Sequence, residues 1–480
     1  MVVFFPLKIA SDFSIPTEAP RSRVEPKGFP FDFAQGRLRM HSEWKEKHFS
    51  PGAGKGPKMN LDVRVNPGLL KLDLYCKGMR IDESCLVEKD GRPILRTRAG
   101  LGSGLEIILP DKLWTNVPVV EEFTKKSPYT LHRDEAGRYE IRLGGGHVCW
   151  VTIPKEPAFY QKLTTRGKKM SRIGVLQGTY LGVYPTETCF YWKIKPKRQN
   201  CDFCSIGLNL GVEEEEDKLV EDVVETAIAA REECKITYVH FNTGYYENDT
   251  YLDQLEPYVQ AVHDRTGLLI GVQTPPHPDF RRYDKLRKMG VNTVSFCFEF
   301  MNKEVFDKRC PGKSRYVGLQ RYLDAIEYCA KLFDTTNGEI VAGPEPVEDT
   351  LRAIDWITSV GAIPTVCIFR PLKGTDAQDD PSPKTEDMVP VFKRLYERCM
   401  ERRLPIGIAH NVEVSIVLKP EECHYFSDHE GKYRFHKAKI WLMNKAIRLV
   451  LQVRVLRAKL GLYGGGKSEK PRPEAAAGAD

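Results

Sequence analysis

Long apolar runs and a secreted-type cysteine pattern are both missing from this sequence. No apolar stretch reaches the roughly 18 residues that a membrane-spanning helix needs, and no signal peptide is present. The 13 cysteines are an odd number without a repeated spacing, so they do not form the disulfide framework of a small secreted protein. We therefore expect a globular protein of the reducing cytoplasm.

A uniform excess of positive charge is also missing, although the formal net charge is +7. The excess lies at the two ends, because residues 1–58 hold ten basic and six acidic side chains and residues 431–480 hold twelve and three. Between them, residues 59–430 hold 50 basic and 56 acidic side chains. A slightly acidic centre weakens any argument from net charge to nucleic acid as the substrate.

Regular patterning is absent from both ends of the chain. Residues 1–58 show no sustained period, so we expect them to be disordered or a non-native N-terminal extension, and we expect residues 463–480 to be a disordered tail. Patterning begins at Met59. Residues 59–155 contain short alternating runs, including LLKLDLYC, divided by Gly, Pro and Asp, which is typical of a small β-rich accessory domain.

Residues 170–415 alternate between strand-like and helix-like runs. The predicted strands cover residues 173–184, 236–244, 268–274, 293–300, 339–345, 363–369 and 405–414. The predicted helices cover residues 213–233, 250–264, 280–289, 317–332, 347–359 and 384–402. Such alternation predicts the α/β class, here a partial or full (β/α) TIM-type barrel whose site lies at the C-terminal ends of the strands.

Three cysteines, Cys189, Cys201 and Cys204, lie on a predicted loop between the first strand and the first helix of this region. The Cys-x2-Cys pair can reach one metal or cluster, and Cys189 can join it if the basic segment between them folds back. A structural zinc site needs four ligands, whereas a [4Fe-4S] cluster held by three leaves one iron open. The alternative is that Cys189 is a buried strand-end thiol and the pair is half of a zinc site.

This loop resembles that of the radical S-adenosylmethionine (radical SAM) superfamily. The family pattern is Cys-x3-Cys-x2-Cys with an aromatic residue before the last cysteine; Phe203 and the final spacing match, but eleven residues replace the usual three between the first two cysteines. The resemblance implies a [4Fe-4S] cluster, S-adenosyl-L-methionine (SAM) and an electron donor such as flavodoxin or ferredoxin. It implies an enzyme that cleaves SAM reductively to a 5′-deoxyadenosyl radical.

Motifs at later strand ends extend the resemblance. HFNTGYYEND stands where the family has a Gly-Gly-Glu turn that meets the methionine amine, which assigns that role to Gly244 and Glu247. The segment GEIVAGPE is close to the Gly-x-Ile-x-Gly-x-x-Glu pattern that flanks the adenine, which assigns Ile340 and Glu345. A surface turn whose glycine only supplies a positive φ is the alternative for Gly244.

The strand at residues 293–300 has a clear period of two. Ser295, Cys297 and Glu299 share one face, and four apolar residues share the other and should meet the outer helices. The resemblance gives Glu299 a polar contact to SAM. Cys297 would share the barrel interior, but two thiols there are too few for a second cluster, so we expect one cluster and no sulfur insertion.

Two further turns, CPGK at residues 310–313 and PLKGT at residues 371–375, resemble the biotin-synthase-like branch of the family. That branch implies a small-molecule substrate.

Residues 416–462 are expected to form a helical extension. The helix predicted at residues 435–460 carries one apolar stripe, and residues 431–460 hold nine basic and no acidic side chains. The stripe consists of Leu442, Leu449, Val453, Leu456 and Leu460. Such a helix can contact a membrane, RNA or an acidic partner, but we expect it to pack on its own domain. A zinc-stabilised protein that binds nucleic acid or membrane without catalysis is the alternative to the radical SAM enzyme, and we do not expect nucleic acid as a partner of the enzyme.

Overall fold

The computed structural model describes residues 61–87, 94, 104–178, 180–185, 187–408, 418–428 and 430–463. They belong to one compact unit that spans residues 58–480. The predictions for residues 1–58 and for all but the first residue of the tail lie outside the described residues.

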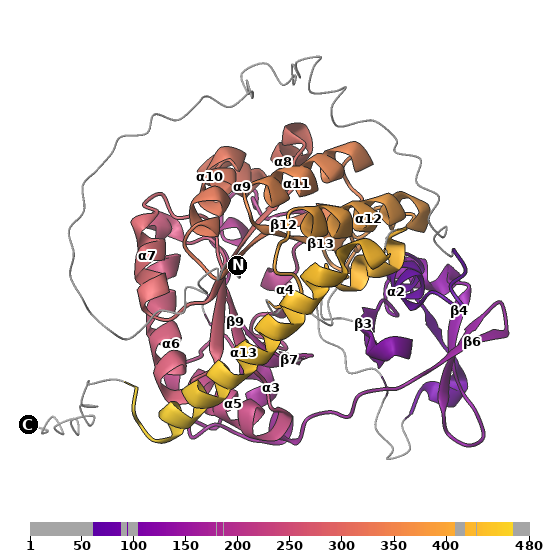
Figure 1. Ribbon diagram of the computed structural model, residues 1–480, viewed down its shortest axis with the longest axis horizontal. Coiled ribbons are helices and arrows are strands. Elements are labelled where there is room, and N and C mark those ends of the chain that lie inside the picture. Colours follow the sequence, from indigo (N-terminus) through magenta and orange to yellow (C-terminus); the bar gives the residue numbers. More distant parts are fainter. Residues whose placement is uncertain are drawn as a thin grey trace, which may run out of the picture. The chain divides into compact units, whose positions relative to one another are not determined.

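A seven-stranded sheet forms the centre of this unit (Figure 1), with the strand order β13-β12-β11-β10-β9-β8-β7. Strands β8 to β13 are parallel, and β7 pairs antiparallel with β8 at one edge. The strands are β7 (Val175–Gln177), β8 (Tyr180–Val183), β9 (Tyr238–Asn242), β10 (Leu269–Gln273), β11 (Thr293–Glu299), β12 (Thr335–Ala342) and β13 (Ile363–Ile368). The sheet is a curled half-barrel, which confirms the predicted fold class.

Helices pack on the outer face of the sheet because that face is apolar. The side chains of Val294, Phe296 and Phe298 in β11 are fully buried in the core that the helices complete. The helices of this layer are α5 (Val220–Cys234), α6 (Tyr251–Thr266), α7 (Arg281–Lys288), α10 (Leu319–Ala330), α11 (Val347–Ser359) and α12 (Thr385–Glu401). Each corresponds to a predicted helix, and α11 has the predicted bounds.

The first predicted strand, residues 173–184, is wrong as a single strand. Helix α3 (Met170–Ile173) ends where it was expected to begin, and β7 and β8 then form an antiparallel hairpin. Gly178 has a φ of +66°, which suits the turn between them. The apolar run at residues 173–184 holds two short strands, and its continuous apolar character concealed the turn between them.

Two other boundaries also differ from the sequence prediction. The helix predicted from residue 213 begins at Val220, because the preceding segment forms the short helix α4 (Ile206–Asn209) and turns. Residues 405–408 of the predicted strand at 405–414 are not in a strand, and residues 409–414 lie outside the described residues.

Two small β-sheets precede the half-barrel. One has the order β1-β4-β5-β6, and the other pairs β2 with β3. The strands are β1 (Arg80–Ile81), β2 (Leu105–Ile108), β3 (Trp114–Val117), β4 (Tyr129–Arg133), β5 (Tyr139–Leu143) and β6 (Gly146–Val151). The β-rich character predicted for this region is confirmed.

The run LLKLDLYC, expected as a strand, is instead part of helix α2 (Pro67–Lys77). The side chain of Asn66 caps the helix by accepting a hydrogen bond of 2.9 Å from the Leu69 N–H, and Pro67 suits the first turn. Leu72 packs in the half-barrel core, whereas Leu70 packs in the core of the small sheets. A helix buried on all sides has no amphipathic period, which explains the wrong prediction.

Buried polar contacts join this region to the half-barrel. The Lys71 ammonium in α2 forms an ion pair of 2.7 Å with Glu422 in the 3-10 helix η9 (Glu422–Phe426), and both side chains are buried. Arg370, after β13, donates a hydrogen bond of 2.8 Å to the Asn116 carbonyl in β3. These contacts join α2 and β3 of the N-terminal region to segments that follow them by about 250 to 350 residues.

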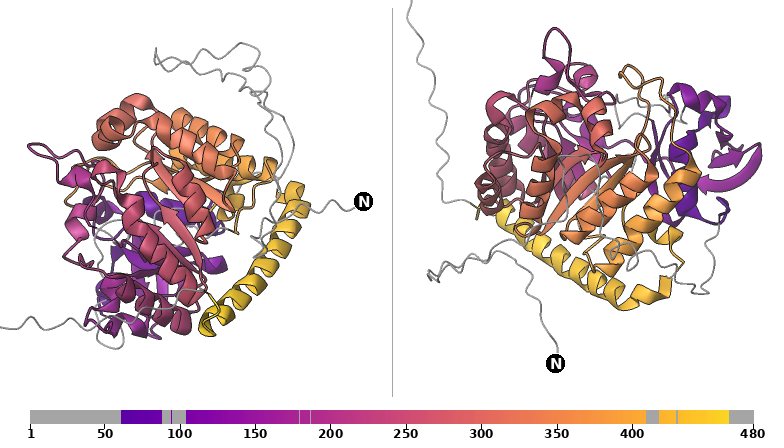
Figure 2. Two further views of the ribbon diagram at one scale, coloured as in Figure 1. Left: turned by 90° about the vertical axis from the view of Figure 1, so that its left-hand side faces the viewer. Right: turned by 90° about the horizontal axis from the view of Figure 1, so that it is seen from above.

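The last described helix is α13 (Arg434–Lys459), preceded by η10 (Glu430–Tyr433). It runs past the ends of the sheet (Figure 2) and lies over Thr237 and Leu269, where β9 and β10 begin. It therefore covers the N-terminal ends of these strands. None of the helices in the described residues is both long and apolar enough to cross a membrane.

Candidate functional site

The three predicted thiol ligands come together beside the C-terminal end of β8. Cys189 precedes the 3-10 helix η7 (Phe190–Trp192), and the inserted segment then folds back, with the Gln199 N–H donating to the Tyr191 carbonyl at 2.9 Å. The Cys204 N–H donates to the Cys201 carbonyl at 3.0 Å, which closes the Cys-x2-Cys turn. Folding back was the condition for Cys189 to join the pair.

Burial disfavours the thiolate forms of Cys189 and Cys204. Burial, together with a smaller contribution from the nearby Cys201, raises the pKa of Cys189 to about 11 and of Cys204 to about 12. The two thiols are thus protonated near neutral pH without a metal, and metal binding would displace their protons. Among the described residues, no three His, Cys, Asp or Glu side chains surround one metal-ion position; the three thiolates of a cluster instead bind different irons.

The turn after β9 packs directly on the cysteine loop. A Cβ atom on Gly244 would lie 2.5 Å from the Cβ of Cys189, so only glycine allows this approach. The Tyr245 ring stacks on Tyr191 with centroids 5.0 Å apart, and the Tyr245 carbonyl accepts from the Phe190 N–H. The tyrosine that replaces the usual glycine therefore supports the longer cysteine loop. Glu247 lies further along, exposed in η8 (Glu247–Asp249).

A second turn on this loop was not assigned to the site from the sequence. It connects α8 (Lys303–Arg309) with α9 (Pro311–Tyr316) and contains Cys310, a fully buried thiol hydrogen-bonded to Cys201. The Gly312 N–H donates to the Gln199 carbonyl at 2.9 Å. The CPGK motif was recognised, but its contact with the cysteine loop is a tertiary feature that no spacing indicates.

Glu299 lies at a β-bulge at the end of β11 and has a φ of +65°. Such a backbone conformation is costly for a non-glycine residue and is concentrated at functional sites. Its carboxylate pairs with the Lys313 ammonium at 2.5 Å, and both side chains are nearly buried. Lys313 also donates to the Cys297 carbonyl at 2.6 Å. The pKa of Lys313 is raised by the nearby Glu299 against the opposing effect of burial.

A buried carboxylate, Glu339 in β12, occupies the concave face of the sheet. It accepts hydrogen bonds from Gln273 at 2.6 Å, from Cys297 at 2.7 Å and from Ser295. The predicted direction of Ser295 and Cys297 is confirmed by these contacts. Burial raises the pKa of Glu339. The period of two in β12 could have identified Glu339, since it alternates with Ile340.

His240 in β9 lies on the same face, because it pairs in register with Gly271 of β10. Burial lowers its pKa to about 4, so the ring is neutral at physiological pH. The Gln273 side chain lies beside the ring and raises this pKa slightly against the effect of burial. The concave face therefore offers a buried carboxylate and a neutral imidazole ring to a ligand.

The two residues predicted to flank the adenine lie in different surroundings. Ile340 is fully buried in the core, one position from Glu339 and hence on the opposite face of the strand. Glu345 is buried in the turn after β12, where it accepts hydrogen bonds from the Asn302 N–H at 2.9 Å and from Thr350 at 3.1 Å. Burial raises the pKa of Glu345 to about 7.

The turn after β13 completes the set of loops at this edge. The Ala377 N–H donates to the Asp202 carbonyl at 3.0 Å, and the Asn200 side chain donates to Asp376 at 3.1 Å. The turns after β9 and β13, and the α8–α9 turn between β11 and β12, thus all contact the cysteine loop that follows β8. This convergence is what the C-terminal edge of a parallel sheet provides.

Comparisons with known proteins agree with this arrangement. Residues 198–357 match the family model "Radical SAM superfamily", a segment that contains Cys201 and Cys204 but starts after Cys189. The protein is thus an α/β half-barrel with a cysteine loop after its first parallel strand. Within that class, residues 198–357, a third of the chain, are similar to the radical SAM superfamily. This similarity implies a [4Fe-4S] cluster and SAM as cofactors.

The similarity to individual proteins is limited in extent. The bacteriochlorophyllide c C-7(1)-hydroxylase of Chlorobaculum limnaeum is 28% identical over 142 residues, which are 28% of this chain and 35% of that protein. The chain therefore matches about a third of the length of this curated relative. Methylornithine synthase (PylB) is 17% identical with a TM-score of 0.36, over 46% of this chain and 62% of that one. Streptococcus suis SuiB bound to SAM is 13% identical with a TM-score of 0.36, over 47% and 48%.

Proposed function

We propose that this protein is an enzyme that cleaves SAM reductively at a [4Fe-4S] cluster held by Cys189, Cys201 and Cys204. The observation that carries the proposal is the convergence of the three thiols on the C-terminal edge of the half-barrel, where three other turns meet them. A cluster held there would supply one electron to the sulfonium of bound SAM, so that the C5′–S bond would break into methionine and a 5′-deoxyadenosyl radical.

The protein's own residues bind and orient SAM in this proposal. Gly244 leaves room for backbone contact beside Cys189, and Glu247 is the carboxylate for the methionine amine. Glu299, held in position by Lys313, supplies a polar contact to SAM. Glu345 and Ile340 are proposed near the adenine; for Ile340 this role needs its backbone, because its side chain lies in the core.

The proposed substrate is a small molecule bound on the concave face of the sheet. Glu339, Gln273 and His240 offer hydrogen-bonding groups there, and the curled sheet shields a radical from water. The turns at residues 310–313 and 371–375 support a place in the biotin-synthase-like branch. An electron donor such as flavodoxin or ferredoxin completes the proposal, with no role for nucleic acid.

A cytoplasmic location is part of the same proposal. All 13 cysteines lie in the described residues and are free thiols, which suits a reducing compartment. We also propose membrane contact through α13, on the exposure and charge of its outer face.

Product analysis tests the proposed reaction. Protein reconstituted anaerobically with iron and sulfide is mixed with SAM and dithionite, and 5′-deoxyadenosine is measured by liquid chromatography. We expect release of 5′-deoxyadenosine that requires both the cluster and the reductant. Stoichiometric zinc without iron, and no 5′-deoxyadenosine, would instead favour the zinc-stabilised binding protein.

A further inference from the structure

The apolar stripe of α13 faces away from the rest of the protein. Six apolar side chains on this stripe are between 50% and 78% exposed. They are the five residues of the predicted stripe, Leu442, Leu449, Val453, Leu456 and Leu460, and Phe435, which extends the stripe towards the start of the helix. At about 1.5 Å per residue, the stripe extends over roughly 38 Å. The expectation that these residues pack on their own domain is therefore wrong for the stripe itself.

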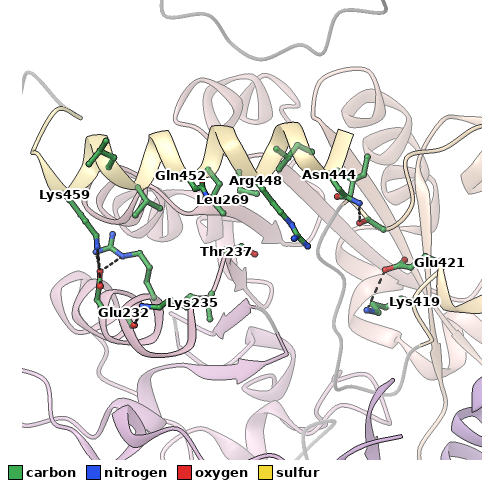
Figure 3. Close-up of a pocket in the computed structure, with 18 residues that line it drawn as sticks. Glu232, Lys235, Thr237, Leu269, Lys419, Glu421, Asn444, Arg448, Gln452 and Lys459 are labelled. Atoms are coloured by element: carbon green, nitrogen blue, oxygen red, sulfur yellow. Dashed lines mark hydrogen bonds and ion pairs between the residues drawn. The ribbon is translucent and has the colours of Figure 1, made fainter. Parts of the chain in front are cut away.

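The inner side of α13 makes both apolar and polar contacts with the protein (Figure 3): Ile440 packs on the main core and Leu451 is buried. Asn444 donates to the Gly407 carbonyl at 3.1 Å, and Lys459 pairs with Glu232 at 3.1 Å. Arg454 donates to the Leu268 carbonyl at 3.2 Å. Leu451 is the one buried residue of the 26 in the helix. Beneath the helix lies a pocket of about 780 Å³, into which the Arg448 side chain points.

An ordinary surface helix buries its apolar stripe and exposes a polar outer face, whereas α13 carries a second apolar stripe on its outer face. A contiguous exposed apolar strip of this length marks a surface that another body covers. Since the inner contacts include specific hydrogen bonds and an ion pair, the outward direction of the stripe is set by the structure around it.

Basic residues border the stripe. Lys439 and Arg457 are exposed along one edge, and Lys445 is exposed along the other. No acidic residue occurs between positions 431 and 463. The Trp441 ring, 59% exposed, lies beside the stripe with the Lys445 ammonium 5.4 Å from its centroid. Leucines flanked by cations and an aromatic ring are the pattern of a helix that lies in a membrane interface.

Charge decides among the candidate partners. A second copy of the chain would bring the same positive helix against this one, and like charges would oppose the contact. Nucleic acid would satisfy the cations, but phosphates and bases leave a strip of leucine and valine without an apolar partner. An anionic bilayer surface satisfies both features, because acyl chains receive the stripe while headgroups meet the lysines and arginines.

We propose that α13 docks the protein on anionic phospholipid membranes, with the helix parallel to the surface and its Phe435–Leu460 stripe in the interface. Because α13 covers the N-terminal ends of β9 and β10, the cysteine loop at the opposite ends of the strands lies away from the docked face. The substrate would then reach the site from the aqueous side.

Vesicle flotation of the full-length protein tests this proposal. Vesicles of phosphatidylcholine with about one third phosphatidylglycerol are compared with pure phosphatidylcholine vesicles at low and high salt. We expect binding to the anionic vesicles at least about tenfold tighter than to the neutral ones, and weaker as salt increases. Exchange of Leu449 and Leu456 for Gln should weaken binding by about tenfold or more.

A matched control exchanges two exposed apolar residues far from α13, Leu163→Gln and Val212→Gln, and should leave vesicle binding unchanged. Iron content and 5′-deoxyadenosine release of all variants should equal those of the wild type, which separates this proposal from the proposed reaction. Absence of vesicle binding, or equal binding by the Leu449/Leu456 variant, would overturn the proposal. So would a wild-type dimer in analytical ultracentrifugation that the same variant dissociates.

Discussion

Gly244 and Cys189 touch so closely that a methyl group on Gly244 would lie 2.5 Å from the Cβ of Cys189 and 2.8 Å from its Cα. This relationship explains why the turn after β9 tolerates two tyrosines but needs this glycine. The tyrosines pack on the cysteine loop from the side, whereas Gly244 lies directly against the proposed ligand.

Gly244→Ala should therefore displace Cys189 and lower the iron content after reconstitution. The physical reason is steric, because a contact of 2.5 Å requires one backbone segment to move. Iron and sulfide assays measure the effect. Gly431→Ala is the control, since an added Cβ there meets nothing within 4 Å and should leave the iron content unchanged. Normal iron content in Gly244→Ala would contradict the tight packing at Cys189.

Removal of single thiols tests the ligand assignment. Wild-type protein should bind about four irons with a broad absorption near 400 nm, as a [4Fe-4S] cluster requires. Cys201→Ala and Cys204→Ala should each abolish the cluster, and Cys189→Ala should do the same. Cys234→Ala changes a thiol at the end of α5 and serves as the control. An intact cluster in Cys189→Ala would show that another residue, with Cys310 as the nearest candidate, supplies the third ligand.

Glu299→Ala should weaken SAM binding by about 10- to 100-fold while the iron content stays unchanged, because a buried polar contact contributes roughly 1–3 kcal/mol. The substitution also leaves the Lys313 ammonium without its carboxylate partner, so thermal stability should be recorded in parallel. Isothermal titration of the reconstituted protein measures the affinity. Glu304→Ala, on the exposed side of α8, is the control. Unchanged SAM affinity in Glu299→Ala would remove Glu299 from the SAM site.

The raised pKa of Glu345 should make the stability of the protein depend on pH. Burial raises its pKa from 4.5 to about 7 in the folded protein. Between these values the unfolded chain loses the proton that the folded protein keeps, so the free energy of unfolding falls as pH rises. The loss amounts to about 3 kcal/mol and is complete above pH 7.

The comparison with Glu345→Gln isolates this contribution, since glutamine does not titrate. Melting temperatures measured from pH 4.5 to 8 should fall more steeply for the wild type than for the variant between pH 5 and 7. Parallel curves for the two proteins would contradict the raised pKa.

Cys297 provides the test for a second cluster. Its thiol donates to Glu339 and is in contact with Gln273, so it already has partners on the concave face. We predict one cluster per chain and no sulfur-insertion activity. Iron content and electron paramagnetic resonance spectra of a variant without Cys189, Cys201 and Cys204 should show no iron–sulfur signal. A residual signal that disappears on further exchange of Cys297 would establish a second cluster.

The sequence was sufficient to predict features that depend on local period and strand ends. The faces of β11 follow from strict alternation, and α11 follows from an apolar period between clear breaks. The β-bulge at Glu299 could not be predicted, because it depends on the register of β11 against β12. The contact of Cys310 with Cys201 joins residues more than 100 positions apart and has no local signal.

Two other differences arise from burial. In α2 every side is covered, so the pattern lacks the polar face that usually identifies a helix. In α13 the apolar stripe is evident, but its direction depends on polar contacts of Asn444, Arg454 and Lys459 with distant segments. Periodicity identifies a face without indicating what the face meets.

The buried ion pair of Lys71 and Glu422 bears on when helix α2 can dock while the chain is being synthesised. The two residues are 351 positions apart, so the ribosome releases the lysine long before its partner exists. At about 5–20 residues per second, the delay is roughly 20 to 70 s. Burying the lysine without its carboxylate is costly. Helix α2 is therefore expected to dock only after the segment around η9 has emerged.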